Sequence, residues 1–253
     1  MKIQKKEYNL GFISDEDIYN HVKKTVLDYR LTIDFYKFNS NLVDPIKLTF
    51  DAKIYRMPIK DLIEQEVIRQ IDKSNSNQIG YFHQNIFKFF SGWEVPKAGF
   101  DVINKDKHYY VEIKNKHNTM NSGGAKSVYI KLQSAILKNP NATSFLVEVI
   151  AKKSQNIPWE TTIDEVKVCD PRIRKVSMDR FYEIVTGDKF AFKKLCEKIP
   201  IIIDDVVNNE NPVKASNEIF DNLNKLDKHL LKSIYLLTFE KYEGFKNGLN
   251  IQQ

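Results

Sequence analysis

Apolar residues recur along this chain at two spacings, one typical of helices and one typical of strands. Ile18, Val22, Val26 and Tyr29 follow an acidic helix start and predict a helix over 15–31. The same two spacings predict further elements downstream. The other predicted helices cover 59–72, 78–90, 125–138, 177–185, 190–198 and 217–240, and the predicted strands cover 100–103, 109–113, 144–151 and 166–169. Helices alternating with strands in this order predict a fold of the α/β (α+β) class.

Polar segments and prolines interrupt this pattern. Residues 73–77 (Lys-Ser-Asn-Ser-Asn) predict a loop, Pro200 is expected to close the helix over 190–198, and residues 201–215 are expected to be extended and then loose. The length fits one large domain or two small ones. We predict a single domain over 1–253, with a helical N-terminal part over about 1–75, a core over 76–200 and a C-terminal helical extension over 201–253.

Charge and cysteine usage narrow the class of partner and the compartment. The formal net charge of +6 and the pI near 9.0 favour an anionic partner, although many basic proteins are simply soluble. Cys169 and Cys196 are far apart, fit no metal-ligand spacing and indicate a reducing compartment. No apolar run follows the N-terminal lysines, and no stretch approaches the length of a membrane span. These features predict a soluble cytoplasmic protein.

The most informative stretch is a polar hairpin over residues 100–118. Its two short apolar runs flank the turn Asn-Lys-Asp-Lys, with Asp101 in the first run and Glu112 and Lys114 at the end of the second. Because side chains alternate along a strand, Glu112 and Lys114 share one face, and strand pairing is expected to bring Asp101 beside them. Two carboxylates and an ammonium make a poor core but can bind a divalent metal and a phosphate.

This trio suits metal-assisted hydrolysis of a phosphodiester. Mg²⁺ prefers oxygen ligands and keeps several waters, so one or two carboxylates suffice to hold it. The metal would lower the pKa of a bound water and neutralise charge on the phosphate. Lys114 can orient the attacking water, deprotonate it, or stabilise the negative charge that develops on the phosphorus centre. The sequence leaves these three roles open.

Acid-x-Lys triplets are common in a chain that is 28% charged, so this motif has competitors. Asp51-Ala-Lys53 and Glu165-Val-Lys167 have the same spacing. The alternative without a function is a solvated hairpin that carries a surface Glu/Lys pair. The triplet at 112–114 is favoured because a strand carrying an acid precedes it and a long polar run follows it.

The run Val-Glu-Ile-Lys-Asn-Lys-His-Asn-Thr-Met-Asn-Ser (111–122), with Phe-Tyr-Glu-Ile-Val-Thr-Gly (181–187) downstream, carries a wider likeness. It resembles the type II restriction endonucleases of the PD-(D/E)XK superfamily that cut GGNCC and related sites, over about 59–200. The resemblance implies a mixed central sheet flanked by helices. It also implies that Asp101 and Glu112 hold Mg²⁺ and that Lys114 assists the water. It also implies cleavage to 5′-phosphate ends, a partner methyltransferase that protects host DNA, and a bacterial setting.

One position departs from the family pattern. In the resembled enzymes, the helix before the first strand often supplies an additional acid. The matching positions are His83, Gln84 and Asn85, none of them acidic, and Glu66 is the nearest substitute. The number of metal ions therefore stays open.

A polar loop and helix face follow the proposed catalytic strand and are expected to lie beside DNA. These positions offer donors for phosphate oxygens and base edges, against the alternative of an ordinary solvated surface. The predicted DNA-binding residues are Lys116, His117, Asn118, Thr119, Asn121, Ser122, Lys126, Lys131 and Gln133.

Our leading hypothesis is a Mg²⁺-dependent, site-specific endonuclease that cuts double-stranded DNA at a short palindrome. A two-fold homodimer would match the symmetry of such a site. Two alternatives stay open, a repair or structure-specific nuclease on the same fold and a DNA-binding protein without catalysis.

Overall fold

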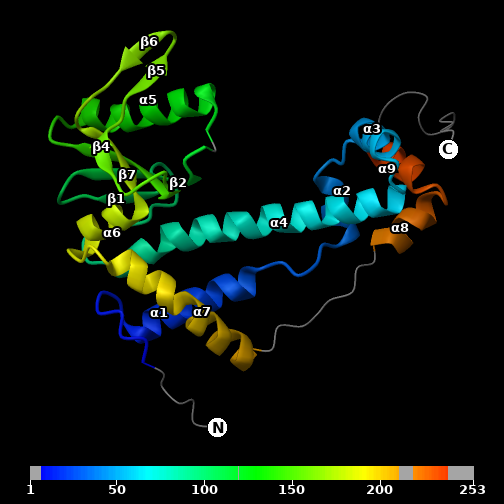
Figure 1. Cartoon of the computed structure of the whole chain (residues 1–253), viewed down its shortest axis with the longest axis horizontal. Helices are drawn as coiled ribbons and strands as arrows, with labels where there is room; N and C mark the ends of the chain where they lie inside the picture. The colour runs from blue at the N-terminus through cyan, green and yellow to red at the C-terminus, as the bar shows by residue number, and fades with distance from the viewer. Residues whose placement is uncertain (1–6, 119, 211–218, 239–253) are drawn as a thin grey trace. The chain divides into compact units, whose positions relative to one another are not determined.

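The computed structural model describes residues 7–118, 120–210 and 219–238 (Figure 1). Its contacts divide the chain into two compact units, the first made of residues 7–28 and 78–210 and the second of residues 29–77 and 219–238. This division differs from the three sequential parts expected from the sequence, because the first unit takes residues from both sides of the second. In the described part of the chain, no helix combines the length and the apolar character needed to cross a bilayer.

Helices precede, separate and follow the strands. The helical elements are α1 Asp15–Asp28, α2 Phe35–Ser40, α3 Pro45–Tyr55, α4 Ile59–Asn85, the 3₁₀ turn η1 Ile86–Phe89, α5 Ser122–Lys138, α6 Met178–Thr186, α7 Ala191–Glu210, α8 Ile219–Leu226 and α9 Leu230–Thr238. The strands are β1 Val102–Asn104, β2 Tyr109–Lys116, β3 Thr143–Ile150, β4 Asn156–Pro158, β5 Thr161–Ile163, β6 Val166–Val168 and β7 Ile173–Ser177.

The first unit is built on a mixed sheet with the strand order β1-β2-β3-β7-β4. Strands β2, β3 and β7 are parallel, while β1 and β4 run antiparallel to their neighbours at the two edges. Strands β5 and β6 form a separate two-stranded sheet, with Asp164 and Glu165 at positive φ in the tight turn between them. The predicted fold class, a mixed sheet flanked by helices, is confirmed.

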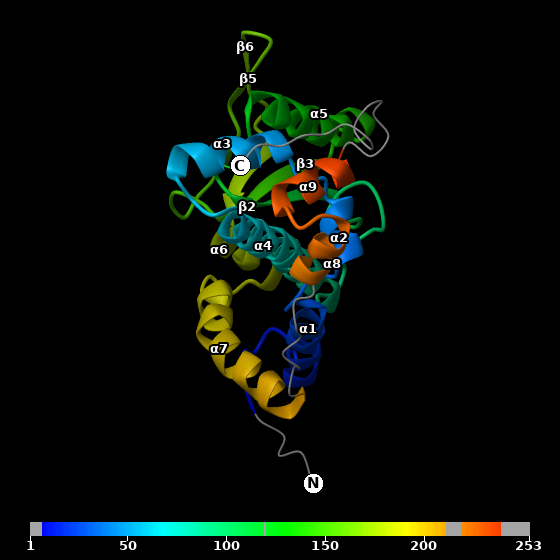
Figure 2. The same cartoon turned by 90° about the vertical axis from the view of Figure 1, so that its right-hand side faces the viewer.

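Helices cover both faces of this sheet, and the two faces differ in character (Figure 1). On one face, Leu132 and other apolar residues of α5 pack on Leu146 and Ile173. On the other, Phe87 and Phe181 pack edge to face with ring centroids 4.9 Å apart, in the cluster that holds Val147. Figure 2 shows α1 and α7 side by side, joined by an ion pair between Lys23 and Glu210 at 2.5 Å. The charged residues of the hairpin lie on the α5 face.

The second unit is helical and has its own apolar cluster. Helices α2, α3, α8 and α9 gather with the N-terminal part of α4 around Phe38, Ile63, Leu223 and Ile234, all of which are buried. Helix α3 begins at the N-cap Asp44, whose carboxylate accepts hydrogen bonds from two backbone amides of the first turn at 2.9 and 3.1 Å.

The loop predicted at 73–77 is wrong, because α4 runs unbroken from Ile59 to Asn85. Polar residues make a weak helix by propensity, and tertiary contacts override that preference here. The Asn75 side chain accepts from the Arg30 amide at 2.8 Å and donates to the Arg30 carbonyl oxygen at 3.0 Å. The polar run is therefore helical and binds the chain that follows α1.

The helix end predicted at Pro200 and the extended segment predicted after it are also wrong. Helix α7 continues through Pro200 to Glu210. Its apolar stripe continues on both sides of the proline, with Leu195, Ile202 and Val206 all buried. Burial of that stripe outweighs the roughly 3 kcal/mol that an internal proline costs a helix.

The C-terminal helix predicted over 217–240 is two helices in the described residues, separated at Asp227. The Asp227 carboxylate accepts from the His229 amide at 2.8 Å, which is a local bond typical of turns. The short strands β4, β5 and β7 were not predicted. Residues 217–218 and 239–240 of that prediction lie outside the described part.

Two histidines, buried His21 and half-buried His83, predict how the stability of the first unit depends on pH. Burial lowers the pKa of His83 from 6.5 to about 4 and also lowers the pKa of His21, which donates to the Phe82 carbonyl oxygen at 2.9 Å. The unfolded chain binds protons at these sites near pH 6.5, whereas folded His83 does not until about pH 4. Stability is therefore full above pH 6.5 and falls as the pH drops from 6.5 toward 4.

From pH 7 to pH 5, His83 is expected to remove up to about 2 kcal/mol of unfolding free energy. In His83→Leu that part of the loss should disappear in urea titrations followed by tryptophan fluorescence, which reports the first unit because both tryptophans lie there. His108→Asn is the matched control, since asparagine tolerates the positive φ of 54° at that turn. An equal loss in His83→Leu and wild type would contradict the prediction.

Candidate active site

The β1–β2 hairpin holds Asp101 against the strand that carries Glu112. Val102 pairs with Val111 at the start of β1, and the Asp101 amide donates to the Val111 carbonyl oxygen at 2.9 Å. The Asp101 carboxylate in turn accepts from the Ile113 amide at 2.7 Å. Asp101 is thus bound to β2 through both its backbone and its side chain, which fixes its carboxylate beside the second acid.

Glu112 and Lys114 lie on one face of β2, as strand alternation requires. Glu112 is 4% exposed, and Lys114 Nζ lies 3.9 Å from Glu112 Oε2. The structure therefore gathers Asp101, Glu112 and Lys114 at one place on the sheet. The hairpin pattern predicted that these three groups lie together, while the roles of the three groups stay predictions.

A second lysine reaches the same carboxylate from helix α5. Lys131 forms an ion pair with Glu112 Oε1, donates to the Gly99 carbonyl oxygen at 2.7 Å, and lies over the Phe100 ring, 5.3 Å from its centroid. Lys131 was predicted to contact DNA, and its contacts here are with the acid cluster. It neutralises a charge that is otherwise poorly solvated.

Burial raises the pKa of Glu112. The hydrogen bond from Lys131 acts in the opposite direction, the Asp101 charge adds to the rise, and the charges of Lys131 and Lys114 oppose it. Crowding of two acids in a half-buried place explains why lysines approach from two elements.

Two carboxylates, from Asp101 and Glu112, are the oxygen donors available for a metal. Over residues 7–118, 120–210 and 219–238, no three His, Cys, Asp or Glu side chains converge in a metal-binding cluster. Mg²⁺ needs few protein ligands because it keeps several waters, so this donor set fits Mg²⁺ better than a metal that demands an all-protein cage.

The helix before the first strand reaches the site with an amide in place of an acid. Gln84, near the end of α4, donates to the Asp101 carbonyl oxygen at 3.0 Å. Glu66, the substitute considered from the sequence, accepts from Arg69 at 2.6 Å and from Gln70 at 2.9 Å within the second unit. Gln84 therefore supports the backbone of Asp101 without adding a carboxylate.

The predicted DNA-binding residues fall into two groups. His117 and Asn121 have structural partners, since the His117 amide donates to the Ile150 carbonyl oxygen at 3.0 Å and Asn121 caps α5 by accepting from the Gly124 amide at 2.8 Å. Lys126 pairs with Asp164 at 2.6 Å. Of the others, Lys116, Asn118 and Ser122 are exposed, Gln133 is half-buried on α5, and Thr119 lies outside the described residues.

One charged pair near the trio was not predicted. Glu148 on β3 is 1% exposed and lies 2.8 Å from Lys175 Nζ on β7. The available signal was a single acid inside the otherwise apolar run 145–150, since an acid in a buried strand is unusual. The lysine that pairs with it belongs to a strand that the sequence did not predict.

The two competing triplets have no such surroundings. Asp51 lies on helix α3 and pairs with Lys47 one turn away. Glu165 is exposed in the β5–β6 turn, on the small separate sheet. Only the triplet at 112–114 combines a sheet face, a neighbouring acid and partial burial.

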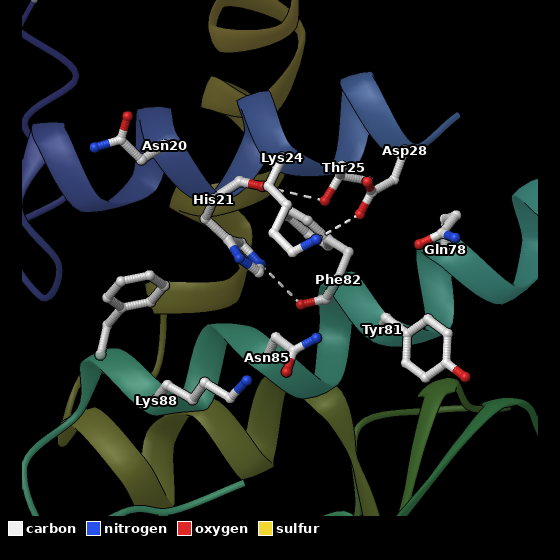
Figure 3. A pocket seen from close by; sticks show the side chains of 11 residues that line it. Asn20, His21, Lys24, Thr25, Asp28, Gln78, Tyr81, Phe82, Asn85 and Lys88 are labelled. Carbon is white, nitrogen blue, oxygen red and sulfur yellow. Dashed lines mark hydrogen bonds and ion pairs between the residues drawn. The ribbon is translucent and has the colours of Figure 1, made fainter. Parts of the chain in front are cut away.

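A cavity of about 440 Å³ lies elsewhere in the first unit, between α1 and the end of α4 (Figure 3). His21 stacks on Phe82 at its wall, and Lys24 pairs with Asp28 at 2.6 Å. The cavity is lined by Asn20, His21, Lys24, Thr25, Asp28, Gln78, Tyr81, Phe82, Asn85, Lys88 and Phe89. Asp101, Glu112 and Lys114 are not among these residues, so the cavity is separate from the acid–lysine trio on the sheet face.

Comparison with known proteins finds type II restriction enzymes among the relatives of this chain. The chain is 32% identical over 250 residues to the type II restriction enzyme Sau96I of Staphylococcus aureus, covering 92% of this chain and 96% of the relative. It is 27% identical over 212 residues to the type II restriction enzyme Eco47II of Escherichia coli, covering 79% and 88%. No solved structure matches significantly.

These matches confirm the prediction of a type II restriction endonuclease, a hydrolase that cuts DNA. The model of the family described as Eco47II restriction endonuclease matches residues 10–208, which span the hairpin, the sheet and its helices. The chain belongs to the Eco47II restriction endonuclease family.

Proposed function

We propose that the chain hydrolyses double-stranded DNA at a short GGNCC-like palindrome in a reaction that needs Mg²⁺, leaving 5′-phosphate and 3′-hydroxyl ends. The observation that carries the proposal is the convergence of Asp101, Glu112 and Lys114 on one sheet face. The resemblance to enzymes that cut GGNCC supports the proposed recognition sequence. The net charge of +6 suits binding to an anionic polymer.

In this proposal each group of the trio has a distinct task. Asp101 and Glu112 hold Mg²⁺, which when bound supplies charge neutralisation at the phosphate and a more acidic water. Asp101 stays fixed by its bond from the Ile113 amide, so its carboxylate needs no reorganisation. Lys114 orients or deprotonates the attacking water, or stabilises the charge that develops on phosphorus.

The proposed partners follow from the substrate. A palindrome presents two equivalent scissile bonds, and a two-fold homodimer would place one trio at each. A methyltransferase of the same specificity would protect host DNA in the bacterial cytoplasm. Discrete fragments from phage DNA incubated with enzyme and Mg²⁺, with sequenced ends that share one motif, would support this function. Smears would favour a structure-specific nuclease, and intact DNA with tight binding would favour a non-catalytic binder.

Removal of either charge from the trio is expected to stop cleavage while leaving DNA binding. Asp101→Asn keeps an acceptor for the Ile113 amide but loses a metal ligand, and Lys114→Ala removes the ammonium. Each should lower the single-turnover cleavage rate by about 10²–10⁴-fold, the range for loss of a group that acts in the transition state. The measurement is a gel assay on a duplex carrying the site.

The matched controls for this pair are Glu165→Gln and Lys167→Ala, which alter a triplet of the same spacing on the separate β5–β6 sheet. Both controls should cut at wild-type rate. Wild-type rates in Asp101→Asn and Lys114→Ala would overturn the assignment of the active site.

Removal of metal should stop the reaction reversibly. Cleavage is expected to cease in a chelator and to return when Mg²⁺ is added in excess, because both candidate ligands are carboxylates. Glu112→Gln should need more Mg²⁺ for half-maximal cleavage than wild type, or should not cut at all. Undiminished cutting in the chelator would exclude the proposed dependence on Mg²⁺.

A further inference from the structure

The buried pair of Glu148 and Lys175 calls for a reason beyond stability. Glu148 is 1% exposed, and apart from its ion pair with Lys175 neither of its carboxylate oxygens has a hydrogen-bond partner among the described residues. Desolvation of such a pair usually cancels its attraction, and apolar residues of similar volume often serve a fold as well or better. Strand β3 is otherwise apolar here, so a leucine would fit the pattern at 148.

The sheet register puts this pair on the same face as the catalytic trio. Lys114 pairs with Glu148 on the neighbouring parallel strand, and Glu112, Leu146 and Lys175 are level with one another across three strands. Paired positions of parallel strands point to the same face. With strands about 4.8 Å apart, the Lys175 backbone lies about 10 Å from β2. Beside Lys114 and Lys131, a third ammonium therefore lies on this face, paired with Glu148 of β3.

Lys175 also remains accessible. Its side chain is 27% exposed, although its partner carboxylate is almost completely buried. A flexible, strongly hydrated ammonium suits a phosphate oxygen better than the edge of a base. Its displacement across the sheet from Lys114 favours contact with a different phosphate from the one that is cut.

We propose that Lys175 binds a DNA phosphate next to the scissile one and that Glu148 is a positioning residue that holds the Lys175 ammonium on the sheet face. This inference rests on the proposed function, since it requires DNA to lie across the trio. Lys175 and Glu148 would then join the three residues that the hairpin contributes to the site.

The test is the salt dependence of binding to a duplex that carries the cleavage site, measured by fluorescence anisotropy in a chelator so that no cutting occurs. Each phosphate contact contributes about 0.9 to the slope of log affinity against log salt. The double variant Glu148→Leu with Lys175→Met removes both charges together and leaves no buried charge unpaired. Its slope should be smaller by about 0.9 per subunit bound. An unchanged slope in a folded double variant would overturn the inference.

The matched control is Lys193→Met with Glu197→Leu, which removes an exposed ion pair of 3.5 Å on α7. This control should keep the wild-type slope. Lys175→Arg should also keep it, because the charge is retained. If the double variant does not fold, Glu148→Gln with Lys175→Gln, which removes both charges but keeps a polar pair, serves as the test, and a wild-type slope there would overturn the inference.

The role of Glu148 needs a readout that a structural role would not change. Glu148→Gln keeps the Lys175 charge, so the slope should stay at the wild-type value while the single-turnover cleavage rate falls about tenfold or more from misplacement of the substrate. An unchanged cleavage rate in Glu148→Gln would remove Glu148 from the proposal. If wild type cuts and Lys114→Ala does not, the proposed function stands whatever the slopes show. If wild type does not cut, the proposed function itself fails.

Discussion

The bond from the Ile113 amide to the Asp101 carboxylate links the fold of this enzyme to its chemistry. Asp101 lies just before β1, where its backbone already pairs with Val111, and its side chain takes a second amide from β2. The hairpin therefore fixes the distance between the two acids by main-chain pairing, and Gln84 adds one hydrogen bond to the Asp101 carbonyl oxygen. Strand pairing is rigid, so the separation of the two carboxylates stays fixed when a ligand binds to them. A fixed separation is the condition for preorganised electrostatics.

That arrangement causes repulsion between two acids in a partly buried place. Lysines from different elements offset this repulsion. Lys131 comes from α5 and Lys114 from β2 itself, so Glu112 has a cation on each side. Glu148 likewise forms an ion pair with Lys175 from β7. The α5 face of the sheet thus carries alternating charges, while the opposite face is packed with aromatic rings such as Phe87, Phe145 and Phe181. The α5 face therefore combines an apolar cluster around Leu132 and Leu146 with these charged pairs, whereas the opposite face is apolar.

The parts of the fold and of the candidate site that could be predicted are those whose interacting residues are close along the sequence. The hairpin and its trio were predictable because strand alternation and a short turn are local properties. The loop expected at 73–77 is helical because Asn75 binds the backbone of Arg30, a partner 45 residues away. Helix α7 passes Pro200 because its apolar stripe is buried on both sides of it, which local propensity does not report. The pair of Glu148 and Lys175 needed the order of strands β3 and β7, so one acid in an apolar run was its only sequence signal.

The same reasoning explains why an acid-x-lysine triplet has meaning only through its surroundings. On α3, an acid and a lysine two residues apart point in different directions around the helix, and Asp51 pairs with Lys47 instead. In the β5–β6 turn, Glu165 is at positive φ and exposed, so water solvates its charge and screens its interactions. On β2, the same spacing puts both groups on one face, the neighbouring strand adds Asp101, and α5 limits access of water to Glu112. Partial burial strengthens each of these interactions relative to the exposed triplets, and this difference in dielectric surroundings, more than the motif itself, singles out the hairpin as the candidate site.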